Sequence, residues 1–152
     1  MTSWRARLAE LGVELPGVVA PVASYLPAVR SGNLVFTSGQ LPMQAGKLPH
    51  VGKVGGAVSA ADGTACARTC ALNALAAIDA LVGIDAVVRV VKVVGYVASA
   101  PGFTGQPAVI NGASDLLGEV FGEAGQHARS AVGVAELPLD APVEVELVVE
   151  VH

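Results

Sequence analysis

The chain has 152 residues, with nine Lys and Arg against thirteen Asp and Glu, a formal net charge of -4 and a mean hydropathy of +0.59. This length is that of one domain with a single core, which buries about two-thirds of the surface that the unfolded chain exposes. The basic residues are scattered along an acidic sequence, which argues against a nucleic-acid partner. Only 14% of the residues are charged and 4% are aromatic, so we expect an aliphatic surface that is partly covered in an oligomer.

The N-terminal segment is predicted to form an accessory helix. Trp4, Leu8 and Leu11 are spaced for one face of a helix over residues 3–11, and a glycine and a proline follow. We therefore assign the whole chain to one domain in which residues 1–16 are the accessory element.

No secretory or membrane-crossing segment is expected. The N-terminal segment has a charge in every turn, unlike a signal peptide, and charged residues and glycines interrupt the longest apolar region, 74–100. The protein is therefore expected to be cytoplasmic and to make no membrane contact. Cys66 and Cys70 lie one helical turn apart and are interpreted as buried reduced thiols rather than a redox or metal site, because no second ligand cluster stands nearby.

The first strands are predicted to form a β-hairpin. Two apolar segments, residues 22–30 and 34–38, flank a Ser-Gly-Asn sequence at 31–33 that favours a turn. Residues 41–57 are rich in Gly and Pro and have no periodicity, so we expect a loop. Within it, residues 52–56 superficially resemble a phosphate cradle, but they lack the Walker spacing and no strand clearly precedes them.

The rest of the chain alternates helices and strands. Residues 59–62 resemble a capping box, and the alanine-rich helix that follows ends at Gly83. A Val-rich run at 86–97 has β-branched residues at most positions, so we expect a buried, central strand. The remaining predicted elements are a helix at 107–121 and strands at 129–136 and 143–151. The order ββαβαββ predicts an α+β fold with one mixed sheet and both helices on one face.

The last predicted strand alternates between two kinds of side chain. Its odd-numbered residues, from Val143 to Val151, are aliphatic, whereas Glu144, Glu146 and Glu150 point the other way. Neither a two-sided core nor a plain solvated edge accounts for all the strands, so the second face of the sheet needs a cover. Packing against sister subunits would provide it.

An arginine and a glutamate near the C-terminus form a candidate site. Arg129 stands at the mouth of an apolar strand, and Glu144 follows about one hairpin later. A guanidinium is a planar fork of donors suited to a carboxylate, and a glutamate held nearby can orient or deprotonate a water. The pair therefore indicates a site for a small acid. The alternatives are a surface arginine at a strand end and solvated glutamates, Glu144 and Glu146, that protect a sheet edge.

Four separated stretches of the sequence carry a family resemblance. They are Tyr25 with Phe36-Thr37-Ser38-Gly39-Gln40-Leu41-Pro42, Val91-Lys92 on to Phe103, Asn111, and Ala128-Arg129-Ser130 through Leu137-Pro138 to Glu146. Through these stretches, in this order, residues 20–150 resemble the Rid proteins, also called the YjgF (RidA-like) or liver perchloric-acid-soluble-protein-like family.

The resemblance implies both a fold and an activity. The fold is chorismate-mutase-like, in a homotrimer whose sheets face inward as a barrel and whose ligand clefts lie at the subunit boundaries. The activity is the hydrolysis of enamines and imines, the products of pyridoxal-phosphate dehydratases or of amino-acid oxidation, to 2-keto acids and ammonia. No cofactor or metal ion is needed, and the expected partner is a small carboxylate-bearing metabolite.

The resemblance also carries residue roles to this chain. Arg129 matches the arginine that clasps the substrate carboxylate, and Glu144 matches the glutamate that helps to hold the attacking water. The other matched pocket positions are Tyr25, Ser38, Gly39 through its backbone, and Asn111.

Each of these further residues has a structural alternative. Tyr25 could be a core or interface aromatic residue, Ser38 a strand-end cap, and Asn111 an exposed helix residue. His127, two residues before the arginine, is either a proton donor or a loop residue that is structural or solvent-exposed. Lys92 is interpreted as a sheet-edge or interface charge rather than a base.

The chain also departs from the common Rid pattern. It has an extra N-terminal helix, a longer glycine-rich loop after Gln40, additional residues between Phe103 and Asn111, and Ala131 where many members carry cysteine. The segment 125–128 is less apolar than usual. These departures indicate a longer branch of the family whose pocket differs in shape.

Two other functions stand beside the deaminase. One is a trimeric binding or regulatory protein that keeps the arginine clasp without turnover. The other is an endoribonuclease or translation inhibitor, a label attached to this family. It ranks lowest, because the acidic chain has no basic stripe, aromatic stacking surface or paired histidines.

Overall fold

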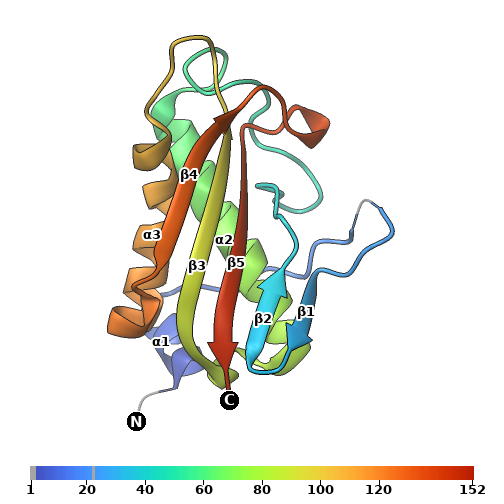
Figure 1. Cartoon of the computed structure of the whole chain (residues 1–152), viewed down its shortest axis with the longest axis vertical. Coiled ribbons are helices and arrows are strands. Elements are labelled where there is room, and N and C mark those ends of the chain that lie inside the picture. Colours follow the sequence, from blue (N-terminus) through green and yellow to red (C-terminus); the bar gives the residue numbers. More distant parts are fainter. Residues whose placement is uncertain (1–2, 22) are drawn as a thin grey trace.

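A five-stranded mixed sheet with helices against one face makes up the computed structural model, which describes residues 3–21 and 23–152 (Figure 1). In chain order the elements are α1 (Trp4–Glu10), β1 (Ala28–Ser31), β2 (Leu34–Thr37), α2 (Ala60–Val82), β3 (Val87–Ala98), α3 (Gln106–Phe121), β4 (Ala128–Val134) and β5 (Val143–Val151). Short 3-10 turns occupy Ile84–Ala86, Gly122–Gly125 and Pro138–Asp140. The predicted α+β class, and the order ββαβαββ after the N-terminal helix, are confirmed.

The strand order β1-β2-β5-β3-β4 decides where the candidate residues lie. β5 takes the middle position, and β3, predicted as the central strand, lies between β5 and the edge strand β4. β3 pairs with β4 in parallel and with β5 antiparallel, because α3 carries the chain back along the sheet before β4 begins. The hairpin predicted between the Arg129 strand and the Glu144 strand is therefore wrong, since β3 separates them.

The first predicted strand is shorter than its apolar pattern. β1 begins at Ala28, and the predicted start, Val22, lies outside the described residues. The Tyr25 N–H donates to the Ala23 carbonyl oxygen (3.0 Å) in a local turn. Pro27 has no N–H for a sheet hydrogen bond, so the chain joins the sheet only after it.

The long loop 41–57 is irregular, as predicted, and one residue fixes its second half. Val54 is fully buried, its N–H donates to the Ala98 carbonyl oxygen (2.7 Å), and its own carbonyl accepts from the Ala100 N–H (3.0 Å). Lys53 forms an ion pair with Glu136 (3.1 Å). These contacts tie the loop to the end of β3 instead of forming a phosphate cradle.

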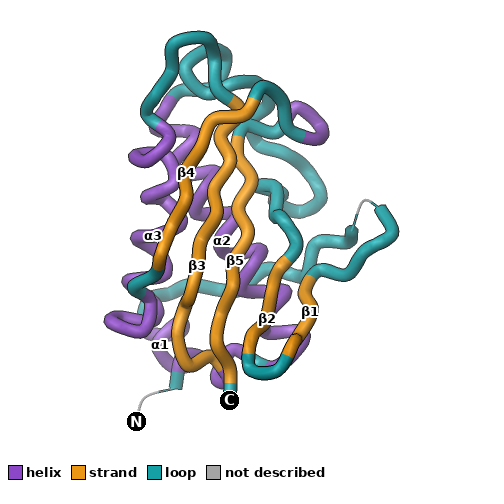
Figure 2. The backbone as a smooth tube through the Cα atoms, in the orientation of Figure 1, coloured by secondary structure: helices purple, strands orange, loops and turns teal. Residues whose placement is uncertain are grey.

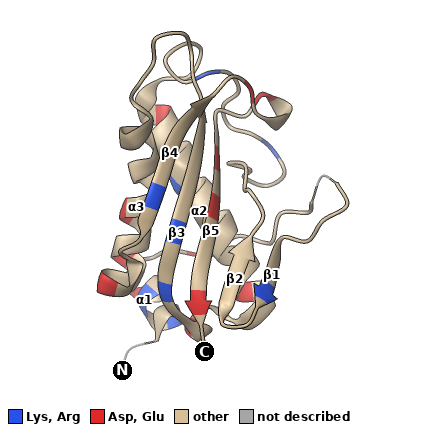
Figure 3. Cartoon of the chain, viewed as in Figure 1, with Lys and Arg blue, Asp and Glu red and all other residues tan. Residues whose placement is uncertain are grey.

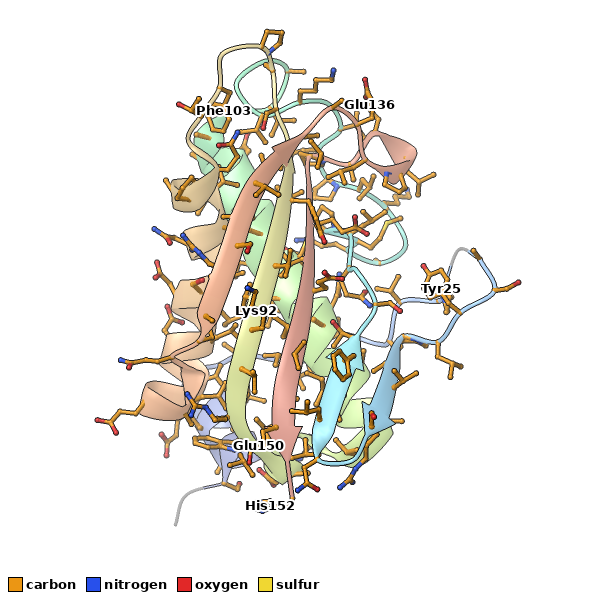
Figure 4. The ribbon with its side chains drawn as sticks, viewed as in Figure 1. Tyr25, Lys92, Phe103, Glu136, Glu150 and His152 are labelled. Atoms are coloured by element: carbon orange, nitrogen blue, oxygen red, sulfur yellow. The ribbon has the colours of Figure 1, made fainter. Side chains whose placement is uncertain are left out.

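Both long helices cover the same face of the sheet, as predicted (Figure 2). Along β5 the odd-numbered residues are buried, and the even-numbered ones are partly exposed on the other face. The register places Phe36 opposite Val29 and Val148 on that uncovered face, and Val29, Phe36 and Val132 stay 41–47% exposed. Figure 4 shows Lys92 in the middle of the same face. No described element of the chain covers these side chains.

The predicted N-terminal helix is present and is tied to the core at one end of the sheet. The Trp4 Nε1–H donates to the Val87 carbonyl oxygen (2.7 Å), and the Trp4 ring meets the Phe121 ring edge-on with centroids 5.1 Å apart. Arg5 forms an ion pair with Asp79 of α2. α1 thereby joins the start of β3 to the end of α3.

The predicted limits of α2 are also confirmed. The Ser59 hydroxyl accepts from the Asp62 N–H (3.1 Å), and the helix ends at Gly83. α2 is long and apolar enough to cross a bilayer, but 56% of its most apolar window is buried, as in a core helix. Cys66 and Cys70 are unpaired and buried, as expected. Burial, followed by the Asp62 charge, raises the pKa of the Cys66 thiol to about 11, so this thiol stays neutral at physiological pH.

The close packing of α2 on α3 depends on a glycine, which a pair of variants tests. A Cβ at Gly112 would overlap the Thr64 carbonyl of α2, whereas Gly118 on the same helix faces open space. We expect Gly112→Ala to lower the free energy of unfolding by about 1–3 kcal/mol, the usual cost of overpacking. The control, Gly118→Ala, should raise it by about 0.5–1 kcal/mol. Urea unfolding measures both, and equal effects would contradict the close contact.

Candidate functional site

Glu144 lies on the uncovered face of the sheet, opposite Tyr96 of β3. Its side chain is half-buried. Burial, followed by the nearby charge of Glu146, raises the pKa of the Glu144 carboxyl. Glu146 differs, because the Tyr96 hydroxyl donates to its Oε1 (3.0 Å), whereas no group among the residues that the structure describes donates a hydrogen bond to the Glu144 carboxyl. Of this pair, Glu144 is the carboxyl that remains available to a ligand.

A pocket of about 70 Å³ opens beside Glu144, and Tyr25 and Gly39 line it together with that carboxyl. The glycine permits this approach, because a Cβ at position 39 would overlap the Glu144 carboxylate. Tyr25 lies on the loop that leads into β1 (Figure 4). The apolar part of the wall includes Val19, Pro21, Leu41 and Met43. The structure therefore brings together three of the predicted site residues.

Ser38 lies next to this pocket rather than on its wall. Its hydroxyl donates to the Leu26 carbonyl oxygen (2.5 Å), and its N–H donates to the Pro27 carbonyl oxygen (2.8 Å). Both bonds hold the segment that carries Tyr25. The observed contacts match the strand-end role, and ligand contact by Ser38 stays a prediction.

Arg129 faces the helices, on the other side of the sheet. Its partner in β3 is the buried Val93, and its guanidinium reaches α3. Nη1 donates to Asn111 Oδ1 (2.7 Å) and to Ser114 Oγ (3.2 Å), and Nη2 donates to the Pro107 carbonyl oxygen (3.3 Å). Arg129 is in none of the ion pairs among the residues that the structure describes. The structure thus joins Arg129 to Asn111 and gives the guanidinium no anionic partner there.

Arg129 and Glu144 do not meet within one chain. With β3 between them, β4 and β5 lie about 10 Å apart, and the two side chains point to opposite faces. Glu144 is in register with Val132, so the two residues are also displaced along the strands. Figure 3 shows a basic position on β4 and acidic positions on β5 with β3 between them. We call the two groups the glutamate half-site, with Tyr25, Gly39 and Glu144, and the arginine half-site, with Asn111, Ser114 and Arg129.

His127 and Ser114 are linked within the arginine half-site. His127 Nε2 lies 2.9 Å from Ser114 Oγ, and Nδ1 lies 2.6 Å from the Gly125 carbonyl oxygen. Sequence reasoning leaves the role of His127 open and misses Ser114 as a site residue. Ser114 follows Asn111 by three positions on a helix, and this spacing is the signal that could have found it.

The described residues contain no group of three or more His, Cys, Asp or Glu side chains that could hold a metal ion. Lys92 lies half-buried on the uncovered face of the sheet, where its predicted role as an interface charge stays a prediction.

Comparisons with known proteins place this fold in a family. Residues 5–151 match the model of the family described as "YjgF/chorismate_mutase-like, putative endoribonuclease". The chain is 46% identical to Protein TCP17 of Trypanosoma cruzi over 149 residues, which cover 97% of this chain and 93% of that protein.

Two solved structures show how the similarity varies. An endoribonuclease-named protein from Shewanella oneidensis is 33% identical, with a TM-score of 0.94 and coverage of 99% of this chain and 100% of its own. E. coli TdcF, solved with bound serine, is 27% identical, with a TM-score of 0.63 and coverage of 90% and 93%. The chain belongs to the YjgF/chorismate-mutase-like family, which is the Rid family of the predicted resemblance.

The raised pKa of Glu144 predicts how stability changes with pH. A carboxyl whose pKa is higher in the folded than in the unfolded chain favours folding while it is protonated, and this contribution is lost as the pH rises through the folded pKa. Glu144→Gln removes the charge and keeps the shape. We expect its melting temperature to exceed that of the wild type by about 1–3 °C at pH 8, with the two values converging toward pH 4.

Glu150→Gln is the control for this measurement, because Glu150 lies on the same face of β5. A pH-independent difference for Glu144→Gln, or an equal gain in Glu150→Gln, would contradict a specific cost of ionising Glu144.

Proposed function

We propose that this chain hydrolyses enamines and imines that bear a carboxylate, releasing 2-keto acids and ammonia, at sites formed between the subunits of a homotrimer. The observation that carries the proposal is the division of the predicted site into two complementary halves. One half offers a guanidinium with unused donors, and the other offers a half-buried carboxyl in a small pocket. Because β3 keeps them apart within a chain, the arginine of one subunit acts with the glutamate of another.

Two features of the sheet support this assembly. β4 is an edge strand, so a neighbouring subunit can approach Arg129 from outside the sheet. The uncovered face exposes aliphatic and aromatic side chains, among them Val29, Phe36 and Val132, which a second copy of the chain would bury.

Arg129 can bind the carboxylate of the substrate. A guanidinium has five N–H donors, and the three hydrogen bonds of Arg129 to α3 leave two for a ligand. A carboxylate accepts two such donors side by side, and the contact is strengthened by charge. E. coli TdcF, a family member, was solved with bound serine, which carries a carboxylate and an amino group.

Glu144 can donate the proton and orient the attacking water. Its carboxyl, whose pKa burial raises, can deliver a proton to the β-carbon of an enamine, which converts the enamine into a protonated imine and leaves Glu144 as a carboxylate. The carboxylate that results can orient a water toward the electrophilic carbon of the C=N bond. Water adds to that carbon, the nitrogen leaves as ammonia, and a 2-keto acid remains, so no cofactor is consumed.

The endoribonuclease name of the family has no such support in this chain. Lys and Arg are dispersed among acidic positions in Figure 3, and the net charge is -4. A ribonucleic acid partner calls for a continuous basic surface with stacking aromatic residues. A carboxylate-binding protein without turnover is the remaining alternative, and Glu144 separates it from the enzyme.

Two variants test the proposed reaction with 2-aminoacrylate or 2-aminocrotonate generated in the assay. Arg129→Ala should lower kcat/KM about 100-fold, mainly through KM, because the substrate carboxylate loses its partner. Glu144→Gln should lower kcat by about 100-fold or more and leave the affinity for 2-ketobutyrate, a product-like carboxylate, nearly unchanged. Loss of substrate absorbance gives the rates, and calorimetry gives the affinity.

Arg89→Ala serves as the matched control, since Arg89 is an exposed arginine of the neighbouring strand β3. Wild-type rates in all three variants would refute the deaminase. Wild-type turnover in Glu144→Gln alone would leave Glu144 without the catalytic role.

A further inference from the structure

We propose that Ser114 and His127 are positioning residues that hold the Arg129 guanidinium in place for the substrate carboxylate. The inference deepens the proposed function and rests on it. It starts from a continuous chain of hydrogen bonds that runs from the Gly125 carbonyl to Arg129.

The first bond in the chain decides the tautomer of His127. Nδ1 lies 2.6 Å from the Gly125 carbonyl oxygen, which can only accept, so Nδ1 carries the proton. In the neutral ring Nε2 is then an acceptor. The Ser114 hydroxyl, 2.9 Å away, must therefore donate its proton to Nε2.

The direction of this bond determines what Ser114 offers to Arg129. With its proton directed at His127, the hydroxyl presents its lone pairs elsewhere, and Arg129 Nη1 donates to the same oxygen at 3.2 Å. Every bond in the chain thus points one way, from guanidinium to hydroxyl to imidazole to carbonyl. Bonds in such a series polarise one another and strengthen the whole.

The far end of the chain is anchored in the backbone. Gly125 is buried, and a Cβ there would overlap the Leu117 carbonyl of α3. The N–H of the next residue, Gln126, donates to the Glu123 carbonyl oxygen (3.1 Å). The acceptor of the His127 proton is therefore held by the packing of the 3-10 turn against α3.

The consequence for binding is preorganisation. A free arginine side chain populates many rotamers, and a ligand contact must overcome the entropy that is lost when one of them is selected. Asn111 and Ser114 accept from the same guanidinium nitrogen, and they lie one turn apart on α3. We call the series of hydrogen bonds from Arg129 through Ser114 and His127 to the Gly125 carbonyl the relay. The relay fixes the plane of that nitrogen, so the Nε–H and one Nη2–H stay directed toward the ligand.

The test measures KM and kcat of Ser114→Ala and His127→Phe with 2-aminocrotonate. Both variants keep the local volume and remove the relay, so we expect KM to rise about tenfold and kcat to change less than about twofold. The double variant should cost no more than either single change, because both interrupt one chain of bonds. The substrate carboxamide, which lacks the carboxylate, should show no change in KM.

His127→Gln is the conservative variant, because its side-chain carbonyl can accept from Ser114 where Nε2 does. It should restore KM to within about threefold of the wild type. Melting temperatures of all variants, with binding of 2-ketobutyrate by calorimetry, give a second readout that does not need turnover.

Two outcomes distinguish the failure of this inference from the failure of the proposed function. If Arg129→Ala raises KM while Ser114→Ala and His127→Phe do not, the relay is structural only and the inference is overturned, whatever happens to the melting temperatures. If Arg129→Ala itself leaves KM and 2-ketobutyrate binding unchanged, the proposed carboxylate clasp fails and the relay fails with it.

Discussion

The pairing of β3 with β4 on one side and with β5 on the other is the constraint on which the rest of the structure depends. It keeps the strand of Arg129 and the strand of Glu144 apart. Gly95 of β3 permits a close approach of α3, because a Cβ there would overlap Ile110 of that helix. The helix therefore lies close under the sheet, and the next residue along it, Asn111, reaches the arginine.

The separation also limits what each of the two charged groups can do within one chain. In one chain, Arg129 is a cation held by a helix on one side of the sheet, and Glu144 is a carboxyl in a pocket on the other. Neither makes a site for a small acid alone. The uncovered sheet face and the free edge of β4 support the proposed assembly, in which the two half-sites meet. In this proposal, catalysis requires the assembly.

Local patterns predict much of this architecture. Ser59 and Gly83 mark the ends of α2, and the alternation from Val143 to Val151 gives both the extent of β5 and its buried face. These signals work because caps and side-chain periodicity depend on neighbours in the sequence. The proline that shortens β1, Pro27, is also local, but the apolar pattern around it conceals its effect.

The order of the strands could not be predicted in the same way. Whether Arg129 and Glu144 share a hairpin depends on where α3 returns the chain, and the composition of the two strands is the same in either case. The bond between Ser114 and His127 likewise needs the turn after α3 to bring the imidazole back to the helix. Family resemblance points to Arg129 and Glu144 together, but only the folded chain divides them between two half-sites.

The most direct measurement of the central claim uses mixed oligomers of two inactive variants. Arg129→Ala and Glu144→Gln are co-expressed with different tags, the mixed species are purified, and deaminase activity is measured against each variant alone. If the site lies between subunits, each mixed trimer joins an intact arginine to an intact glutamate at one of its boundaries, so about one third of wild-type activity returns. Mixed trimers as inactive as the parents would contradict the account.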